Sequence, residues 1–111
     1  MVSDKFGSLS LAARSGLRLL AAEIQAGRKM RGWSEDELAR RLGCARKTVR
    51  AIEAGQPTVA IGFVFEAAQL VGLDLFGGAQ AIDARLAETR IKLNLLPQRV
   101  HSRRPELNDD F

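Results

Sequence analysis

The chain of 111 residues carries a formal net charge of +4, and 46% of its residues are hydrophobic but only 5% are aromatic. This length fits one domain with a tail, and the scarcity of β-branched runs favours an all-α fold. One cysteine excludes an internal disulfide, and no apolar run approaches the length of a membrane span. The N-terminus has no signal-peptide pattern, so we expect a cytoplasmic protein without membrane contact.

The basic charge is concentrated in one part of the sequence. Residues 28–50 contain eight Lys and Arg against three Asp and Glu, whereas residues 51–84 contain four acidic residues and no basic one. A local positive field beside an acidic remainder is typical of a surface that binds a polyanion such as DNA. The alternative from charge alone is the ordinary solvated face of a charged helix.

The N-terminal part contains one long helical pattern. Residues 1–14 show no clear hydrophobic period, and we expect a flexible N-terminal arm there or, as the alternative, a loosely docked leader that is helical from Ser8 or Ser10. Residues 15–31 are predicted to form a helix capped by Ser15. Gly27 lies inside it, where glycine costs up to ~1 kcal/mol against alanine, and therefore indicates a close contact with another helix. The positions expected to be buried are Leu17, Leu20, Ala21 and Ile24.

Two short helical patterns meet at Gly43 within residues 33–55. Ser34 and Glu37 have the S-x-x-E spacing of a capping box, which begins the first helix, and Gly43 ends it with a positive φ. The second helix, residues 46–54, has one apolar and one basic face. It is expected to bury Val49 and Ile52 and to leave outside Arg46, Lys47, Arg50 and Ala51.

This arrangement is that of a helix-turn-helix, in which the second helix enters the DNA major groove and reads bases near its N-terminus. Arg46 and Lys47 lie at that start and can donate to guanine O6 and N7. Arg50 reaches either a base or a phosphate, and the methyl group of Ala51 can contact that of thymine. The candidate phosphate donors are Ser34 and Thr48, with Arg40 and Arg41 at the periphery.

A fourth helix is expected over residues 59–71, with Thr58 as its cap. The sequence changes character at Gly77-Gly78. We therefore expect three parts: the arm, a DNA-binding domain over residues 15–78, and a C-terminal part over residues 79–111. The side chains of the fourth helix that are expected to close the core are Ile61, Val64, Phe65, Ala68 and Leu70.

The C-terminal part begins with a predicted helix, residues 79–90, that would bury Ile82 and Leu86. Residues 91–96 fit either a strand, since apolar side chains alternate there, or a continuation of the helix. A polar tail follows Pro97, and we expect it to be disordered on its own. The candidate partner-binding residues in this part are Ile91, Leu93, Leu95 and Arg99.

Residues 17–76 resemble the lambda-repressor/Cro-like helix-turn-helix family, also called the xenobiotic-response-element (XRE) class. The resemblance implies a compact five-helix domain, here with a C-terminal extension, that binds operator DNA, usually as a dimer. It also implies a structural ion pair between Arg28 and Glu53. The chain departs from the family at Ala45, where a Ser or Thr cap is common. The matching residues are Arg28, the W-S-E-D-E-L-A run, Leu42-Gly43, Thr48-Val49, Ile52-Glu53-x-Gly55 and Ala67-Ala68-x-Leu70-x-Gly72-Leu73.

Two functions are compatible with these features. The first is a transcriptional repressor that binds a palindromic operator in double-stranded DNA as a homodimer. The second is an antitoxin-like protein, similar to antitoxins of the HipB type, that neutralises a toxin through residues 79–111 and represses its own operon. The apolar stripe Ile91, Leu93 and Leu95 could instead pair between two copies as the dimer interface.

Other kinds of chemistry find little support in the sequence. No paired nucleophile and base, phosphate loop or cofactor motif is visible, so we expect neither enzymatic activity nor a cofactor. His101 is the only histidine and has no Cys or His at ligand spacing, which argues against a metal site. Cys44 is expected to pack in the core rather than to sense oxidation.

Overall fold

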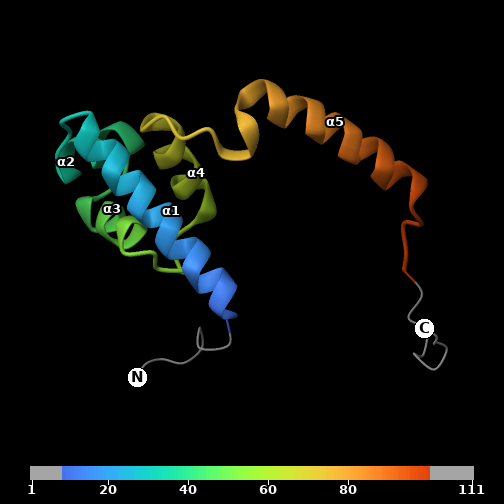
Figure 1. The fold of residues 1–111 in the computed structure, drawn as a ribbon, viewed down its shortest axis with the longest axis horizontal. Helices are drawn as coiled ribbons and strands as arrows, with labels where there is room; N and C mark the ends of the chain where they lie inside the picture. Colours follow the sequence, from blue (N-terminus) through green and yellow to red (C-terminus); the bar gives the residue numbers. More distant parts are fainter. Residues whose placement is uncertain (1–8, 101–111) are drawn as a thin grey trace. The chain divides into compact units, whose positions relative to one another are not determined.

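The computed structural model describes residues 9–100, so the expectations for residues 1–8 and 101–111, including His101, lie outside the described part. Within that part the chain forms five α-helices, one short 3-10 turn and no strand (Figure 1). The predicted all-α fold class is therefore confirmed. The chain divides into two compact units, Met1–Leu75 and Phe76–Phe111, which are described one at a time.

The first helix, α1 (Leu11–Met30), begins five residues earlier than a helix capped by Ser15 would begin. Its cap is Ser10 and not Ser15, because the Ser10 hydroxyl accepts a hydrogen bond from the backbone N–H of Ala13 at 3.0 Å. The segment expected to be an arm, residues 1–14, is thus helical from Leu11 onward.

The next two helices, α2 (Glu35–Leu42) and α3 (Arg46–Glu53), form the predicted helix-turn-helix. The Ser34 hydroxyl caps α2 by accepting a hydrogen bond from the Glu37 N–H at 3.0 Å. Gly43 ends α2 in the left-handed region at φ 74°, which only glycine adopts without a steric cost. The turn therefore has the geometry that the sequence predicted.

The fourth helix, α4 (Ile61–Leu70), begins two residues later than expected. Ala60 precedes it without a side-chain hydrogen bond, and Thr58 lies in the turn upstream, so Thr58 is not its cap. The helix also buries smaller side chains than expected, which lets it approach its neighbours closely. Its buried residues are Ala67 and Ala68, whereas its exposed apolar residues are Ile61, Phe63 and Phe65.

The core of the first unit lies between these four helices. Helix α3 packs against α1 and α2, and α4 packs against α2. A Cβ atom placed on Gly27 of α1 would lie 2.8 Å from the Cβ of Val71, just after α4, so the close contact predicted at Gly27 is confirmed. The buried apolar cluster consists of Ile24, Leu38, Ala39, Val49, Ile52, Ala67 and Ala68.

The second unit contains α5 (Ala79–Leu95), a single helix that continues into the segment for which a strand was the alternative. The strand alternative is therefore wrong. None of the residues of α5 is buried. Ile82 and Leu86, which we expected in a core, are 38% and 46% exposed and line a shallow hollow together with Phe76.

Replacing Gly27 by Ala should destabilise the first unit by ~1–3 kcal/mol, because the added methyl group would overlap Val71 and displace α1. Gly16 is the matched control on the same helix, since nothing lies within 4 Å of its Cβ position. Gly16→Ala should stabilise the protein by up to ~1 kcal/mol through helix propensity alone. Urea unfolding followed by circular dichroism measures both changes, and equal midpoints would contradict the close contact.

Candidate nucleic-acid interface

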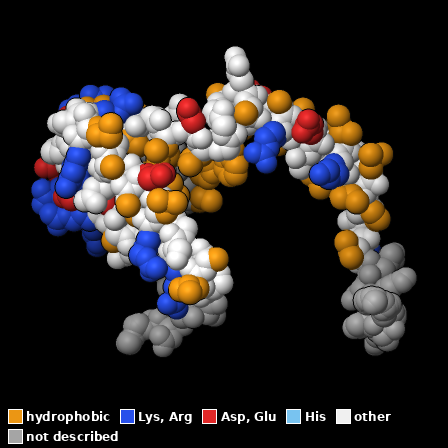
Figure 2. Space-filling model, in the orientation of Figure 1, with side chains coloured by type: hydrophobic (Ala, Val, Ile, Leu, Met, Phe, Trp, Pro, Cys, Tyr) orange, Lys and Arg blue, Asp and Glu red, His pale blue; other side chains and the backbone are white. Residues whose placement is uncertain are grey.

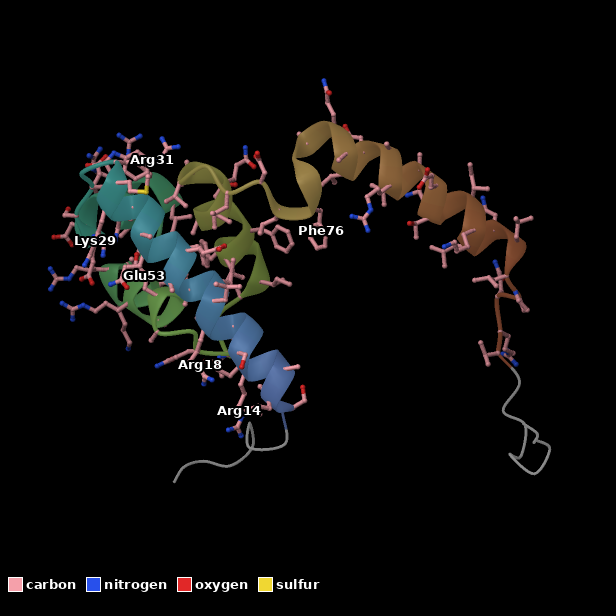
Figure 3. The ribbon with its side chains drawn as sticks, viewed as in Figure 1. Arg14, Arg18, Lys29, Arg31, Glu53 and Phe76 are labelled. Atoms are coloured by element: carbon pink, nitrogen blue, oxygen red, sulfur yellow. The ribbon has the colours of Figure 1, made fainter. Side chains whose placement is uncertain are left out.

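A buried ion pair joins α1 to the end of α3. Arg28 Nε donates to Glu53 Oε2 at 2.7 Å and Nη2 donates to Oε1 at 2.9 Å, with the two side chains only 7% and 5% exposed. Glu53 is labelled beside α1 in Figure 3. The hydrogen bonds to Glu53 raise the pKa of the Arg28 guanidinium, and desolvation, which opposes this shift, does not cancel it. These are the two positions at which the family resemblance placed an ion pair.

A third donor of Arg28 holds the start of α2. Its Nη1 donates to the backbone carbonyl of Trp33 at 3.0 Å, one residue before the Ser34 cap. The Trp33 ring packs against the core, and the guanidinium carbon of Arg41 lies 4.1 Å from the ring centroid in a cation–π contact. The N-terminus of α2 is therefore held by contacts with α1 and with the last turn of α2 itself.

Helix α3 has two distinct faces, as predicted. One side is packed into the core, and the other points away from it and carries the predicted reading residues. Figure 2 shows Lys and Arg side chains gathered over this part of the molecule, with acidic side chains among them. The buried residues of α3 are Val49 and Ile52; the exposed ones are Arg46, Lys47 and Arg50, and Ala51 is half-buried.

Acidic side chains from the first turn of α2 reach two of these arginines. Arg50 Nε donates to Glu35 Oε1 at 3.1 Å, and Arg46 Nη1 lies 3.5 Å from Asp36 Oδ2. The sequence pattern did not indicate this contact. The signal that points to it is a run of three acidic residues, 35–37, inside an otherwise basic segment.

The candidate phosphate donors differ in how available they are. The Ser34 hydroxyl uses one lone pair to accept the Glu37 N–H, which leaves its own proton for a phosphate oxygen. Thr48 is half-buried, and its side chain makes a hydrogen bond with Cys44. Ala45 gives α3 no side-chain cap, as the sequence indicated, so backbone N–H groups in the first turn are also available.

Glu37 engages both of the arginines that were predicted at the periphery. Arg41 Nε donates to Glu37 Oε2 at 2.7 Å, and Arg40 donates to the other carboxylate oxygen. Only the Ser34 half of the predicted capping box is therefore formed, since the Glu37 carboxylate is directed to the arginines. Arg40 and Arg41 bind along α2 and are not brought to the outward face of α3.

Cys44 lies half-buried at the edge of the core. Burial raises the pKa of its thiol, and the hydrogen bond with Thr48, which acts in the opposite direction, does not reverse the shift. A thiol with a raised pKa is a poor nucleophile at neutral pH. This environment fits packing better than redox sensing.

The candidate partner-binding residues of the C-terminal part do not form one stripe. Consecutive residues of an α-helix are rotated by about 100°, so Leu93 lies on the opposite side of α5 from Ile91 and Leu95. Arg99 follows the helix and is exposed. The continuous stripe instead has the helical spacing 4-3-4 and consists of Ile82, Leu86, Thr89 and Leu93.

Two further findings apply to residues 9–100. No group of three or more His, Cys, Asp or Glu side chains in this part is placed to hold a metal ion. None of its helices combines the length and the apolar character needed to cross a membrane.

Comparison with known proteins identifies the helix-turn-helix. Residues 24–76, from the middle of α1 through α2, α3 and α4 to the 3-10 turn Leu75–Gly77, match the family model described as "Helix-turn-helix". No curated protein and no solved structure was found to match the chain. Residues 24–76 therefore form a helix-turn-helix domain of the XRE class, as the resemblance indicated, and this domain supports a role in DNA-binding regulation.

The raised pKa of Cys44 predicts that iodoacetamide alkylates the folded protein several-fold more slowly at pH 8 than the protein unfolded in urea.

The same pKa shift makes the stability of the fold depend on pH. The contribution of the neutral thiol to stability is complete below its ordinary pKa of ~8.5 and is lost as the pH rises through the higher folded value. Cys44→Ala should abolish this alkaline decline, and equal alkylation rates would contradict the burial of the thiol.

Proposed function

We propose that the protein is a sequence-specific transcriptional repressor that binds a palindromic operator as a homodimer. The observation that carries the proposal is the outward face of α3, where three cations are exposed on a helix whose other face packs in the core. In a helix-turn-helix this helix enters the major groove. Arg46 and Lys47 donate to guanine O6 and N7, and Arg50 reads a base one turn further on. The methyl group of Ala51 contacts a thymine methyl.

Contacts with the DNA backbone keep α3 in register. The Ser34 hydroxyl and the first N–H groups of α3 donate hydrogen bonds to phosphate oxygens. The positive end of the helix dipole adds to the attraction for the phosphate. Thr48 is not placed among these donors, because its side chain is engaged with Cys44 and its backbone N–H donates to the Ala45 carbonyl at 2.9 Å. Arg40 and Arg41 reach phosphates only by leaving Glu37.

Two copies are needed to read a palindrome, because the half-sites lie in successive major grooves ~34 Å apart. Helix α5 supports such pairing. It has 17 residues and none is buried, although helices in proteins owe most of their stability to packing. Ile82 and Leu86 also line, with Phe76, a shallow hollow of ≈ 250 Å³ that a side chain of a second copy would fill.

An antitoxin-like role is the second candidate, and the opposite face of α5 favours it. Ile91 and Leu95 are 62% and 81% exposed and stay exposed when the stripe around Leu86 is covered. With Arg99 they offer a toxin an apolar surface next to a cation. Co-expression with the product of the neighbouring gene tests this role, because the complex should be lost when Ile91 and Leu95 are replaced by Glu.

Replacing Arg46 and Lys47 by Ala should lower operator affinity by at least about 30-fold, since each specific base contact contributes ~1–3 kcal/mol. Helical content and melting temperature should not change, because both side chains are exposed. Fluorescence anisotropy with an operator recovered by random-pool selection measures the loss, and the logarithm of affinity should fall steeply with that of salt concentration.

The matched control for that experiment is Arg90→Ala with Lys92→Ala, which removes one Arg and one Lys from α5 without touching the hollow beside Leu86. The control should keep most of the operator affinity. A double variant at positions 46 and 47 that still binds the operator like the wild type would rule out the proposed reading face.

Replacing Leu86 and Leu93 by Glu should convert the homodimer to a monomer, because the stripe would carry two desolvated charges in the interface. Light scattering measures the mass. The same pair of substitutions at Ile91 and Leu95, on the opposite face of α5, is the control and should leave the mass unchanged. Dimers of the same stability in both variants would exclude α5 as the interface.

A further inference from the structure

We propose that Glu35 is a positioning residue for DNA reading: its carboxylate holds the Arg50 guanidinium so that both terminal nitrogens face a guanine in the major groove. The inference rests on the proposed DNA-binding function and adds to it a residue outside α3. It also distinguishes Glu35 from its neighbour Asp36, which carries the same charge in the same helical turn.

The atoms in the contact decide which edge of Arg50 remains free. Arg50 Nε donates to Glu35 Oε1 at 3.1 Å. The two Nη groups, which form the fork that fits guanine O6 and N7, take no part in that bond. The Arg50 side chain is still 60% exposed. The carboxylate therefore restrains the guanidinium plane without occupying the edge that reads a base.

Glu35 is itself well anchored. It is the first residue of α2, two residues after the Trp33 carbonyl that Arg28 holds. The hydrogen bonds to Glu53 and, to a smaller extent, the nearby charge of Glu35 raise the pKa of Arg28, so Glu35 lies within the electrostatic reach of the buried ion pair. The acceptor for Arg50 thus lies at a helix start that is held by the Ser34 cap and by the hydrogen bond from Arg28 to Trp33.

Asp36 has the same charge but a different geometry. Its Oδ2 lies 3.5 Å from Nη1 of Arg46, so it occupies part of the fork that Arg46 needs for a base. The Asp36 side chain is 71% exposed, and exposed pairs at this distance contribute little. Arg46 must leave Asp36 before it reads a guanine, whereas Arg50 can read while it is bound to Glu35.

The two carboxylates therefore affect DNA binding in opposite ways. Both repel the phosphates of any duplex, whatever its sequence. On a duplex that offers no guanine to Arg50, repulsion is the only effect of Glu35. On the operator the oriented fork more than offsets this repulsion, because less side-chain freedom is lost when the base contact forms. Glu35 thus increases the ratio of operator affinity to non-operator affinity.

The test compares Glu35→Ala with Asp36→Ala in the full chain, since each removes one carboxylate from the first turn of α2. Affinities are measured at one salt concentration for the selected operator and for a scrambled duplex of the same length and composition. A bidentate contact discriminates between bases by about 5- to 150-fold. We expect Glu35→Ala to lower operator affinity by about 3- to 10-fold and to raise scrambled affinity, and Asp36→Ala to raise both.

A second measurement separates positioning from a general effect on the fold. Random-pool selection with Glu35→Ala should relax the preference at the same base pair that Arg50→Lys relaxes, and the double variant should relax it no further. If Glu35→Ala raises operator affinity as Asp36→Ala does, Glu35 only repels DNA and the inference is wrong. If the proposed DNA-reading function itself is wrong, the wild-type protein binds the operator and the scrambled duplex equally. That result is seen before any variant is compared, so it is distinguishable from a failure of the inference about Glu35.

Discussion

The ion pair between Arg28 and Glu53 is the contact on which the geometry of the proposed DNA-binding face depends. A buried pair adds little net stability compared with apolar packing, because desolvation offsets the attraction between the charges. The main effect of the pair in this domain is to fix the relative orientation of the helices that it joins. The guanidinium has its donors in a fixed plane, and these meet the Glu53 carboxylate and the Trp33 carbonyl at once. One side chain of α1 thereby sets the start of α2 relative to the end of α3.

The small apolar core explains why a directional contact matters in this domain. Among the described residues, nine hydrophobic side chains are buried and four of these are alanine. Alanine allows helices to approach closely but buries little area and has no rotamer to interlock, so it constrains the angle between two helices weakly. The relative orientation of α2 and α3 therefore depends on the polar contacts of Arg28. Glu35, at the start of α2, accepts a hydrogen bond from Arg50 and so connects this held helix start with the outward face of α3.

Apart from the close contact at Gly27, the features that residue patterns predicted are those decided by neighbouring residues. The Ser34 cap and the left-handed turn at Gly43 depend on local backbone geometry, and both are present as expected. The start of α1 was ambiguous between Ser10 and Ser15, because the two serines are equally good caps by local criteria. Contacts that span two helices, such as Glu35 with Arg50, leave only an ambiguous trace in the sequence. An acidic first turn is favourable for the helix dipole alone, so it did not indicate a second role.

The alternation at residues 91–96 was ambiguous because α5 is apolar on two opposite sides, and this property also bears on regulation. In the proposed homodimer a second copy covers the stripe that contains Leu86, while Ile91 and Leu95 stay accessible. Dimerisation and operator binding are then linked, so operator occupancy depends more steeply on protein concentration than it would for a monomer. A partner that covers Ile91 and Leu95 alters repression only if its affinity differs between the monomer, the free dimer and the DNA-bound dimer.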